Sequence, residues 1–194
     1  EALAVADEGS LPAVAGALGF PLVLKIDAPS VVHKSDAGGV ILGIEDEASL
    51  GRAFAGLRER FAGVEDATVV AQQMAPAGQE LILGAAAAGD LGRTVLLGLG
   101  GIFVEVLEDV ALGLAPLSAA DAGAMIRSLA AYPALAGARG SAGVDLDALQ
   151  DLLLRVAALA ADLDGLAEMD LNPVIAYPPG GPPPSAVDVR VRFV

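Results

Sequence analysis

The sequence predicts an α+β fold in which antiparallel β-hairpins are interspersed with a few amphipathic helices. Short apolar runs bounded by glycine or proline turns are typical of strands, and several of these runs follow one another with no helix between them. In other stretches, apolar residues recur at helical spacing. Strands do not alternate strictly with helices, as they would in a parallel sheet. The 194 residues suffice for one domain or two small lobes.

In the first part of the chain, strands are expected at residues 22–26, 40–44 and 68–74. Helices are expected at residues 10–18 and 46–61. Ser10 and Asp46 are candidate N-caps, and Gly19 is a typical stop signal. Residues 1–9 are too short to form a capped element of their own.

In the second part, strands are expected at residues 80–86, 94–97, 102–107, 167–171, 174–177 and 186–194. Ser118 begins a helix to about residue 131, with Asp121 three residues later in a capping-box arrangement. Asp145 begins the longest helix, to about residue 163. Its expected buried stripe is Leu149, Leu152, Leu153, Val156, Leu159 and Leu163.

The glycine-rich stretch 98–101 follows an expected strand, as a dinucleotide-binding fingerprint would. However, the next apolar run resembles another strand rather than an amphipathic helix, so we reject a Rossmann site. We expect these glycines to form a tight turn at which the backbone approaches another segment closely.

Composition excludes several classes of function. The formal net charge of −14 argues against a nucleic-acid surface. The absence of cysteine excludes disulfides and zinc-thiolate sites, and a single histidine leaves an oxygen-ligated ion such as Mg²⁺ as the metal to expect. No apolar run reaches the roughly 18 residues of a membrane span, and the chain does not open with a signal segment. We therefore expect a cytoplasmic protein with no membrane partner.

All of the lysine and histidine in the chain falls within ten residues, as Lys25, His33 and Lys34. Lysine binds phosphate as a point charge, and a nearby glycine pair lets backbone N–H groups approach an anion. This segment therefore predicts a phosphate site between two strands. The alternative is a hairpin whose lysines serve as surface solubilisers.

Oxygen ligands gather near the C-terminal end of the sequence, as Glu168, Asp170, Asn172 and Asp188. Asp170 and Asn172 are two residues apart, so they share one face of a regular strand. We expect Pro173 to end pairing there and Asp188 to lie on a strand that returns alongside. A carboxamide with carboxylates suits Mg²⁺ that carries substrate phosphates. Alternatively, Asn172-Pro173 is a plain turn and Asp188 faces outwards.

Several segments, each weak by itself, occur in one characteristic order across nearly the whole chain. They are Gly-Phe-Pro-Leu-Val-Leu-Lys-Ile (19–26), His-Lys-Ser-Asp-Ala-Gly-Gly-Val (33–40), Gln72-Gln73-Met74, Gly78-Gln79-Glu80-Leu81-Ile82, Gly-Leu-Gly-Gly-Ile-Phe-Val-Glu (98–105), Leu-Ala-Pro-Leu (114–117), Ala138-Arg139-Gly140, Met-Asp-Leu-Asn-Pro (169–173) and Val-Asp-Val-Arg (187–190). In these segments the sequence resembles the ATP-grasp domain of nucleoside-diphosphate-forming acyl-CoA synthetases, relatives of the succinyl-CoA synthetase β subunit. The resemblance implies two α+β lobes, about residues 10–73 and 74–194, that clamp a nucleotide. It also implies that the family's opening helix and strand are missing before residue 1.

The resemblance further implies specific roles around ATP or ADP and Mg²⁺. Lys25 would contact the nucleotide phosphates, and a loop with Lys34, Ser35, Gly38 and Gly39 would cover them. The adenine edge would be bounded by Gln72, Gln73 and Met74, with Glu80 close by. Mg²⁺ would be held by Asn172 and Asp188 together with Asp170. His33 would relay phosphate between ADP and a phosphohistidine on a separate CoA-binding ligase domain or subunit, which is consistent with imidazole chemistry.

The sequence departs from the family pattern at two places. Family members often carry an arginine in the loop occupied here by Ala86-Ala87-Ala88, and another at the position of Gly113. We expect the loss of two cations near an anionic site to weaken activity or nucleotide binding. The alternative function is therefore a weak or inert regulatory module, as in fusions with protein acetyltransferases, and a carboxylate–amine ligase is a weaker third. The acid substrate, ADP against GDP and a possible oligomer stay open.

Overall fold

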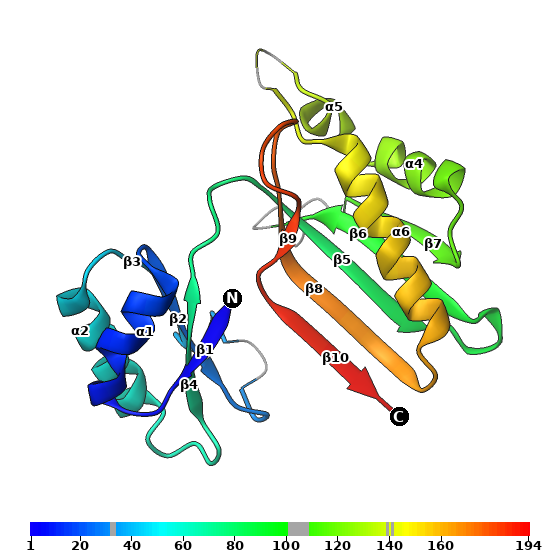
Figure 1. Cartoon of the computed structure of the whole chain (residues 1–194). Helices are drawn as coiled ribbons and strands as arrows, with labels where there is room; N and C mark the ends of the chain where they lie inside the picture. The colour runs from blue at the N-terminus through cyan, green and yellow to red at the C-terminus, as the bar shows by residue number, and fades with distance from the viewer. Residues whose placement is uncertain (32–33, 101–108, 139, 141) are drawn as a thin grey trace. The chain divides into compact units, whose positions relative to one another are not determined.

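The computed structural model describes residues 1–31, 34–100, 109–138, 140 and 142–194 (Figure 1). These residues form two compact units, Glu1–Met74 and Ala75–Val194. Each unit contains one sheet in which every described strand pair is antiparallel, with its longer helices packed on one face. The predicted α+β class is confirmed. No helix in the described ranges is long and apolar enough to span a membrane.

The first unit has a four-stranded sheet in the order β1-β4-β2-β3. Its strands are β1 (Ala2–Val5), β2 (Leu22–Asp27), β3 (Val40–Ile44) and β4 (Thr68–Gln73), and its helices are η1 (Glu8–Ser10), α1 (Leu11–Leu18) and α2 (Glu47–Arg60). Our expectation of no capped element in residues 1–9 is wrong. Asp7 Oδ1 accepts a hydrogen bond from the backbone N–H of Ser10 at 2.9 Å and caps η1. The Ser10 side chain belongs to that capping box and makes no side-chain cap of α1.

The core of the first unit lies between its sheet and its helices. In strand β2, Leu22, Leu24 and Ile26 are almost completely buried on the helix side, so Lys25 lies on the opposite face together with Val23, which is also buried. Helix α2 begins where the sequence predicted, because Asp46 accepts a hydrogen bond from the Ser49 N–H at 2.6 Å in a capping box.

The second unit has a larger sheet, in the order β10-β8-β5-β6-β7 with the short β9 paired to β8. Its strands are β5 (Gln79–Ala87), β6 (Arg93–Leu99), β7 (Val110–Ala115), β8 (Leu166–Ala176), β9 (Ser185–Ala186) and β10 (Val189–Phe193). Its helices are η2 (Gly89–Leu91), α4 (Ala119–Ser128), α5 (Tyr132–Leu135) and α6 (Leu146–Asp162). Helix α6 packs on β5, β6, β7 and β8, while α4 packs on β7 and α6 (Figure 1). No described helix of this unit packs on the other face of the sheet.

Strand β8 corrects the predicted break at Asn172-Pro173. The strand is continuous through both residues, because they form a bulge against β5: Leu171 is paired with Leu83, and Val174 with Leu81. A bulge is one of the few places where a sheet tolerates proline, which has no N–H to donate. The predicted closing strand is instead divided into β9 and β10.

The predicted buried stripe of α6 is correct at its first turns and wrong at Leu159. Leu149, Leu153 and Val156 are buried, whereas Leu159 is 46% exposed. Leu159 lies about 120° around the helix from Leu153, off the buried line. Alanines at 157 and 160 fill that line and let the helix lie close to the sheet. The predicted N-cap Asp46 and the predicted capping box of Ser118 are present, as is the Asp145 N-cap. The predicted strand 102–107 lies outside the described residues.

Candidate functional site

In the first unit, the sheet face opposite the helices carries Lys25 and Gln72. Lys25 is paired with Val70 on one side and Val40 on the other, so two strands flank its half-buried side chain. Gln72 is paired with Val23 in the same sheet. The ammonium and the carboxamide thus lie on one face, which could present both groups to a polar ligand.

Gln73 and Met74 do not share that arrangement. Ala71 is completely buried on the helix side, and alternation assigns Gln73 to the same side as Ala71, although Gln73 is exposed at the strand end. Met74 follows the strand, and its N–H donates to the Pro21 carbonyl at 2.9 Å. The sheet therefore separates Gln73 from Lys25 and Gln72.

The glycine-containing loop is folded back onto β2. The Gly39 N–H donates to the Lys34 carbonyl at 2.7 Å, and the Gly39 carbonyl accepts from the Ile26 N–H at 2.7 Å. The Gly38 N–H donates to the Ser35 carbonyl at 2.9 Å. His33, the expected phosphate relay, lies outside the described residues.

Two side chains that the sequence did not single out hold this loop. Asp27 forms an ion pair with Lys34 at 3.3 Å, and the Lys34 side chain is 22% exposed. Arg60, at the end of α2, donates to the Gly38 carbonyl at 2.9 Å. No sequence signal indicated Arg60, because it lies 22 residues from Gly38 and approaches it only through the packing of α2.

The two loop glycines have packing reasons of their own. Gly38 has a φ of +66°, in the left-handed region, and a Cβ there would collide with the Arg60 guanidinium. A Cβ on Gly39 would lie 2.5 Å from Ile26 Cγ2 and 3.0 Å from the Lys34 carbonyl oxygen. Close backbone approach is therefore required inside the loop, whether or not a phosphate is bound.

In the second unit, the acidic residues of β8 lie on the face without helices. Glu168 is paired with Arg192 of β10, and the two side chains form an ion pair at 3.5 Å. Asp170 is paired with Arg190. Partial burial raises the pKa of Asp170, the Glu168 and Asp188 carboxylates raise it further, and Arg190 opposes them. Negative charge therefore exceeds positive charge around Asp170.

The structure brings Asn172 and Asp188 to the same place as Asp170. The Asn172 N–H donates to the Asp188 carbonyl at 3.1 Å, at the bend between β9 and β10. Asp188 thus lies beside the β8 bulge, and its carboxylate acts on the Asp170 pKa. No set of three or more histidine, cysteine, aspartate or glutamate side chains suited to a metal occurs in the described ranges. Two carboxylates with one carboxamide still suit Mg²⁺, which commonly keeps water and phosphate ligands.

The start of β5 places Glu80 at an exposed position next to a close backbone contact. The Gly100 N–H donates to the Glu80 carbonyl at 2.9 Å, and a Cβ on Gly100 would lie 2.8 Å from Glu80 backbone and side-chain carbons. The expected close approach is therefore found at Gly100. The expected tight turn is wrong for Gly98, which lies within β6.

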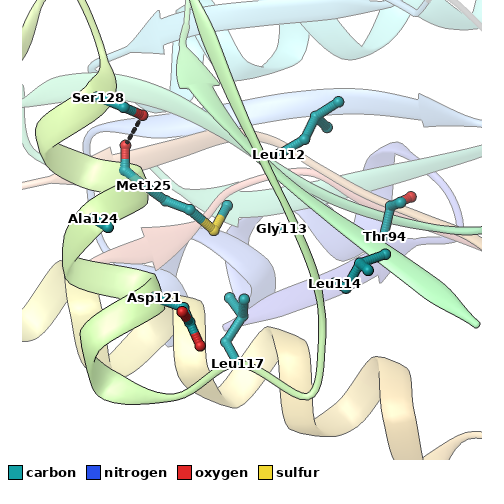
Figure 2. Close-up of a pocket in the computed structure, with 9 residues that line it drawn as sticks. All are labelled: Thr94, Leu112, Gly113, Leu114, Leu117, Asp121, Ala124, Met125 and Ser128. Carbon is teal, nitrogen blue, oxygen red and sulfur yellow. Dashed lines mark hydrogen bonds between the residues drawn. The ribbon is translucent and has the colours of Figure 1, made fainter. Parts of the chain in front are cut away.

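The family arginines are missing at two places in or beside the second sheet, the segment Ala86-Ala87-Ala88 and Gly113. Ala86 is paired with Glu168, on the face without helices. Gly113 lies on the helix side, where a Cβ would meet Leu117 and Met125 at 2.7 Å. An arginine at 113 would thus point to the face opposite that of Asp170, and the expected effect of its loss on nucleotide binding stays a prediction. Gly113 instead lines a groove of about 610 Å³ between α4 and β7 (Figure 2).

Comparison of the sequence with known proteins shows which family it matches. A model of the ATP-grasp domain matches residues 1–193. The chain is 41% identical over 183 residues to the beta subunit of acetate–CoA ligase (ADP-forming) I from Pyrococcus furiosus, which covers 92% of this chain and 77% of that protein. It is also 41% identical over 171 residues to acetate–CoA ligase (ADP-forming) I from Archaeoglobus fulgidus. That match covers 86% of this chain but spans a quarter of the relative's length.

A solved structure matches the fold as a whole. It is acetyl-coenzyme A synthetase 1 from Candidatus Korarchaeum cryptofilum, with a TM-score of 0.84, 40% identity, and coverage of 97% of this chain and 83% of that chain. That protein is in complex with coenzyme A and Mg-AMPPCP, and its phosphohistidine segment points towards the nucleotide-binding site.

Proposed function

The chain belongs to the ATP-grasp domain family of ADP-forming acyl-CoA synthetases, and we propose that it is the nucleotide-binding domain of an acid–CoA ligase that interconverts ADP and ATP. The observation that carries this proposal is the 41% identity to an ADP-forming ligase beta subunit over 92% of the chain. We further propose that the units Glu1–Met74 and Ala75–Val194 correspond to the two lobes of the ATP-grasp fold.

The first unit would supply the phosphate and adenine contacts. Lys25 would bind the nucleotide phosphates, and the loop formed by Lys34, Ser35, Gly38 and Gly39 would cover them. The hydrogen bonds that fold this loop onto β2 support the role, because a loop that is already ordered loses little conformational entropy when an anion binds. Gln72 would contact adenine from the face that carries Lys25, while Gln73, Met74 and Glu80 are weaker candidates.

The second unit would supply the metal ligands Asp170, Asn172 and Asp188. The excess of negative charge around Asp170 supports a cation there, because a divalent ion would offset the repulsion among the carboxylates. When bound, Mg²⁺ would neutralise phosphate charge, which is the main requirement of phosphoryl transfer. The complex of the Korarchaeum synthetase with Mg-AMPPCP supports this choice of ion.

The reaction would exchange one phosphorus bond for another. The N–P bond of a phosphohistidine breaks, the terminal phosphate oxygen of ADP forms the new O–P bond, and the imidazole is released; the reverse direction consumes ATP. His33 would receive the phosphoryl group from a first phosphohistidine on a CoA-binding domain or subunit. A separate partner is supported by relatives in which the matching part is a beta subunit or one quarter of a longer chain.

Reconstitution with a CoA-binding partner subunit tests this proposal. ATP formation from ADP, phosphate and an acyl-CoA should require both proteins and should be lost in His33→Ala, while calorimetry shows unchanged ADP affinity in that variant. A surface variant remote from the proposed site, Asp151→Asn on α6, should behave as the wild type. Unchanged turnover in His33→Ala would overturn the relay role.

One observation favours a second candidate, a regulatory module that binds nucleotide without turnover. The family arginine is missing from the segment Ala86-Ala87-Ala88, and Ala86 of this segment lies on the face that carries Glu168 and Asp170. If the reconstituted enzyme binds Mg·ADP but forms no ATP, and Ala86→Arg restores turnover, the regulatory assignment is supported over the catalytic one.

A further inference from the structure

Two arginines of β10 lie opposite two carboxylates of β8. Glu168 is paired with Arg192, and Asp170 is paired with Arg190. The two pairs are two residues apart on both strands, so all four side chains lie on one face of the sheet, the face opposite α6. Each carboxylate therefore has an arginine directly beside it in the neighbouring strand.

Only one of the two arginines is used by the carboxylate opposite it. The Arg192 guanidinium forms an ion pair with Glu168 at 3.5 Å. Among the residues that the structure describes, Arg190 forms no ion pair and no side-chain hydrogen bond, although Asp170 is its partner in the ladder. The side chain of Arg190 is exposed. The described residues therefore leave the N–H donors of its guanidinium to another acceptor.

The other neighbour of Asp170 in the sheet has no side chain. Gly84 of β5 is paired with Asp170, and Leu96 of β6 is paired with Gly84 on its far side. Arg190 is thus the only side chain that the adjoining strands place directly beside Asp170. Strand β5 itself puts no side-chain atom against a ligand bound at this carboxylate.

The charges of this region fit a phosphate that is bound to a metal ion. The described carboxylates of Glu168, Asp170 and Asp188 outnumber the guanidinium groups of Arg190 and Arg192 by one. A divalent ion at the proposed metal ligands would reverse the sign of this net charge. A phosphate group on that ion would then be attracted by the nearest guanidinium group, whose planar fork suits two phosphate oxygens.

We propose that Arg190 is a phosphate-binding residue, whose guanidinium donates hydrogen bonds to a phosphate group of ADP that is also a ligand of the Mg²⁺ ion beside it. This inference rests on the proposed function, because it assumes ADP and a metal ion at Asp170, Asn172 and Asp188. It adds a direct contact with the nucleotide from β10. Arg192 has no such role, since Glu168 already holds its guanidinium.

The sign of one effect separates this role from simple charge neutralisation. If Arg190 only offset the charge of Asp170, its removal would make the region more negative, and Mg·ADP would bind more tightly through its metal ion. If Arg190 donates hydrogen bonds to phosphate, its removal should weaken the binding of Mg·ADP. The two roles thus predict opposite changes in the same affinity.

Calorimetric titration of ADP into the 194-residue chain at saturating Mg²⁺ measures this change. In Arg190→Gln the dissociation constant should rise at least about tenfold, as expected for the loss of hydrogen bonds between charged groups. The matched control is Arg192→Gln, which removes an equal charge two residues away on the same face of β10. Its dissociation constant should stay within about threefold of the wild-type value. Circular dichroism checks that both variants are folded.

The outcomes separate this inference from the proposed function. A wild type that binds Mg·ADP, with an Arg190→Gln variant that binds it equally well or more tightly, overturns the role of Arg190 and leaves the proposed function in place. Equal losses in Arg190→Gln and Arg192→Gln also overturn it, because the net charge of the face would then set the affinity. A wild type that binds no Mg·ADP overturns the proposed function, and this inference with it.

Discussion

The loop that precedes β3 should not tolerate a methyl group at Gly39. In Gly39→Ala the new Cβ would lie 2.5 Å from Ile26 Cγ2, 3.0 Å from the Lys34 carbonyl oxygen and 3.2 Å from Phe61 Cζ. These neighbours come from β2, the loop itself and the end of α2, so no single small shift relieves all three contacts. Overpacking of this kind costs about 1–3 kcal/mol. The substitution should therefore destabilise the first unit by that amount and displace the loop.

A second glycine in the same unit provides the matched control. Gly56 lies inside α2, and a Cβ there would meet no atom within 4 Å. Gly56→Ala should therefore stabilise the protein by about 0.5–1 kcal/mol, because alanine has the higher helix propensity. The same glycine-to-alanine change should thus lower the free energy of unfolding at position 39 and raise it at position 56.

Urea unfolding followed by far-ultraviolet circular dichroism measures both variants, and amide hydrogen exchange of β2 and β4 assigns the change to the first unit. Because the loop also carries Lys34, ADP affinity should fall in Gly39→Ala and stay unchanged in Gly56→Ala. A Gly39→Ala protein as stable as the wild type would refute the packing argument. A destabilised variant with full ADP affinity would refute the loop's proposed role.

Two further substitutions test the second unit. Asp109, which is buried at the start of β7, accepts hydrogen bonds from the N–H groups of Ala130 at 2.7 Å and Ala131 at 2.9 Å. Asp109→Ala should therefore lower the free energy of unfolding by about 2–4 kcal/mol, as measured by tyrosine fluorescence during unfolding. A decrease below about 1 kcal/mol would contradict this. The raised pKa of Asp170 means that its stabilising contribution is complete below the ordinary value of 3.8 and is lost as pH rises through the folded-state pKa. Asp170→Asn should therefore be at least as stable as the wild type at neutral pH, and this advantage should vanish near pH 3.8. The Mg²⁺-dependent ADP affinity of the variant should fall. A variant less stable than the wild type at neutral pH would contradict the charge argument.

Local signals accounted for most of the secondary structure. The N-caps Asp46, Ser118 and Asp145 could be predicted because a capping side chain lies within three residues of the group it binds. The apolar run of residues 22–26 likewise predicted strand β2. The continuity of strand β8 through Asn172-Pro173 escaped prediction, because Pro173 is tolerated by a bulge whose existence depends on pairing with β5, nearly a hundred residues away.

The candidate site likewise combines features that local sequence predicts with features that depend on tertiary packing. Residue types alone pointed to Lys25 and to the oxygen ligands of β8, since the chain has few lysines and few places where acids and a carboxamide come together. Their environment could not be read from the sequence. The ion pair of Asp27 with Lys34, the anchoring of the loop by Arg60 and the orientation of Gly113 toward Met125 are all consequences of packing.

Calorimetric titration of ADP into this chain at increasing Mg²⁺ concentrations tests the central claim most directly. The account predicts binding of one ADP per chain, an affinity that rises with Mg²⁺, loss of most of that rise in Asp188→Asn, and weak binding at every Mg²⁺ concentration in Lys25→Ala. ADP affinity that is independent of Mg²⁺ and indifferent to both substitutions would contradict it.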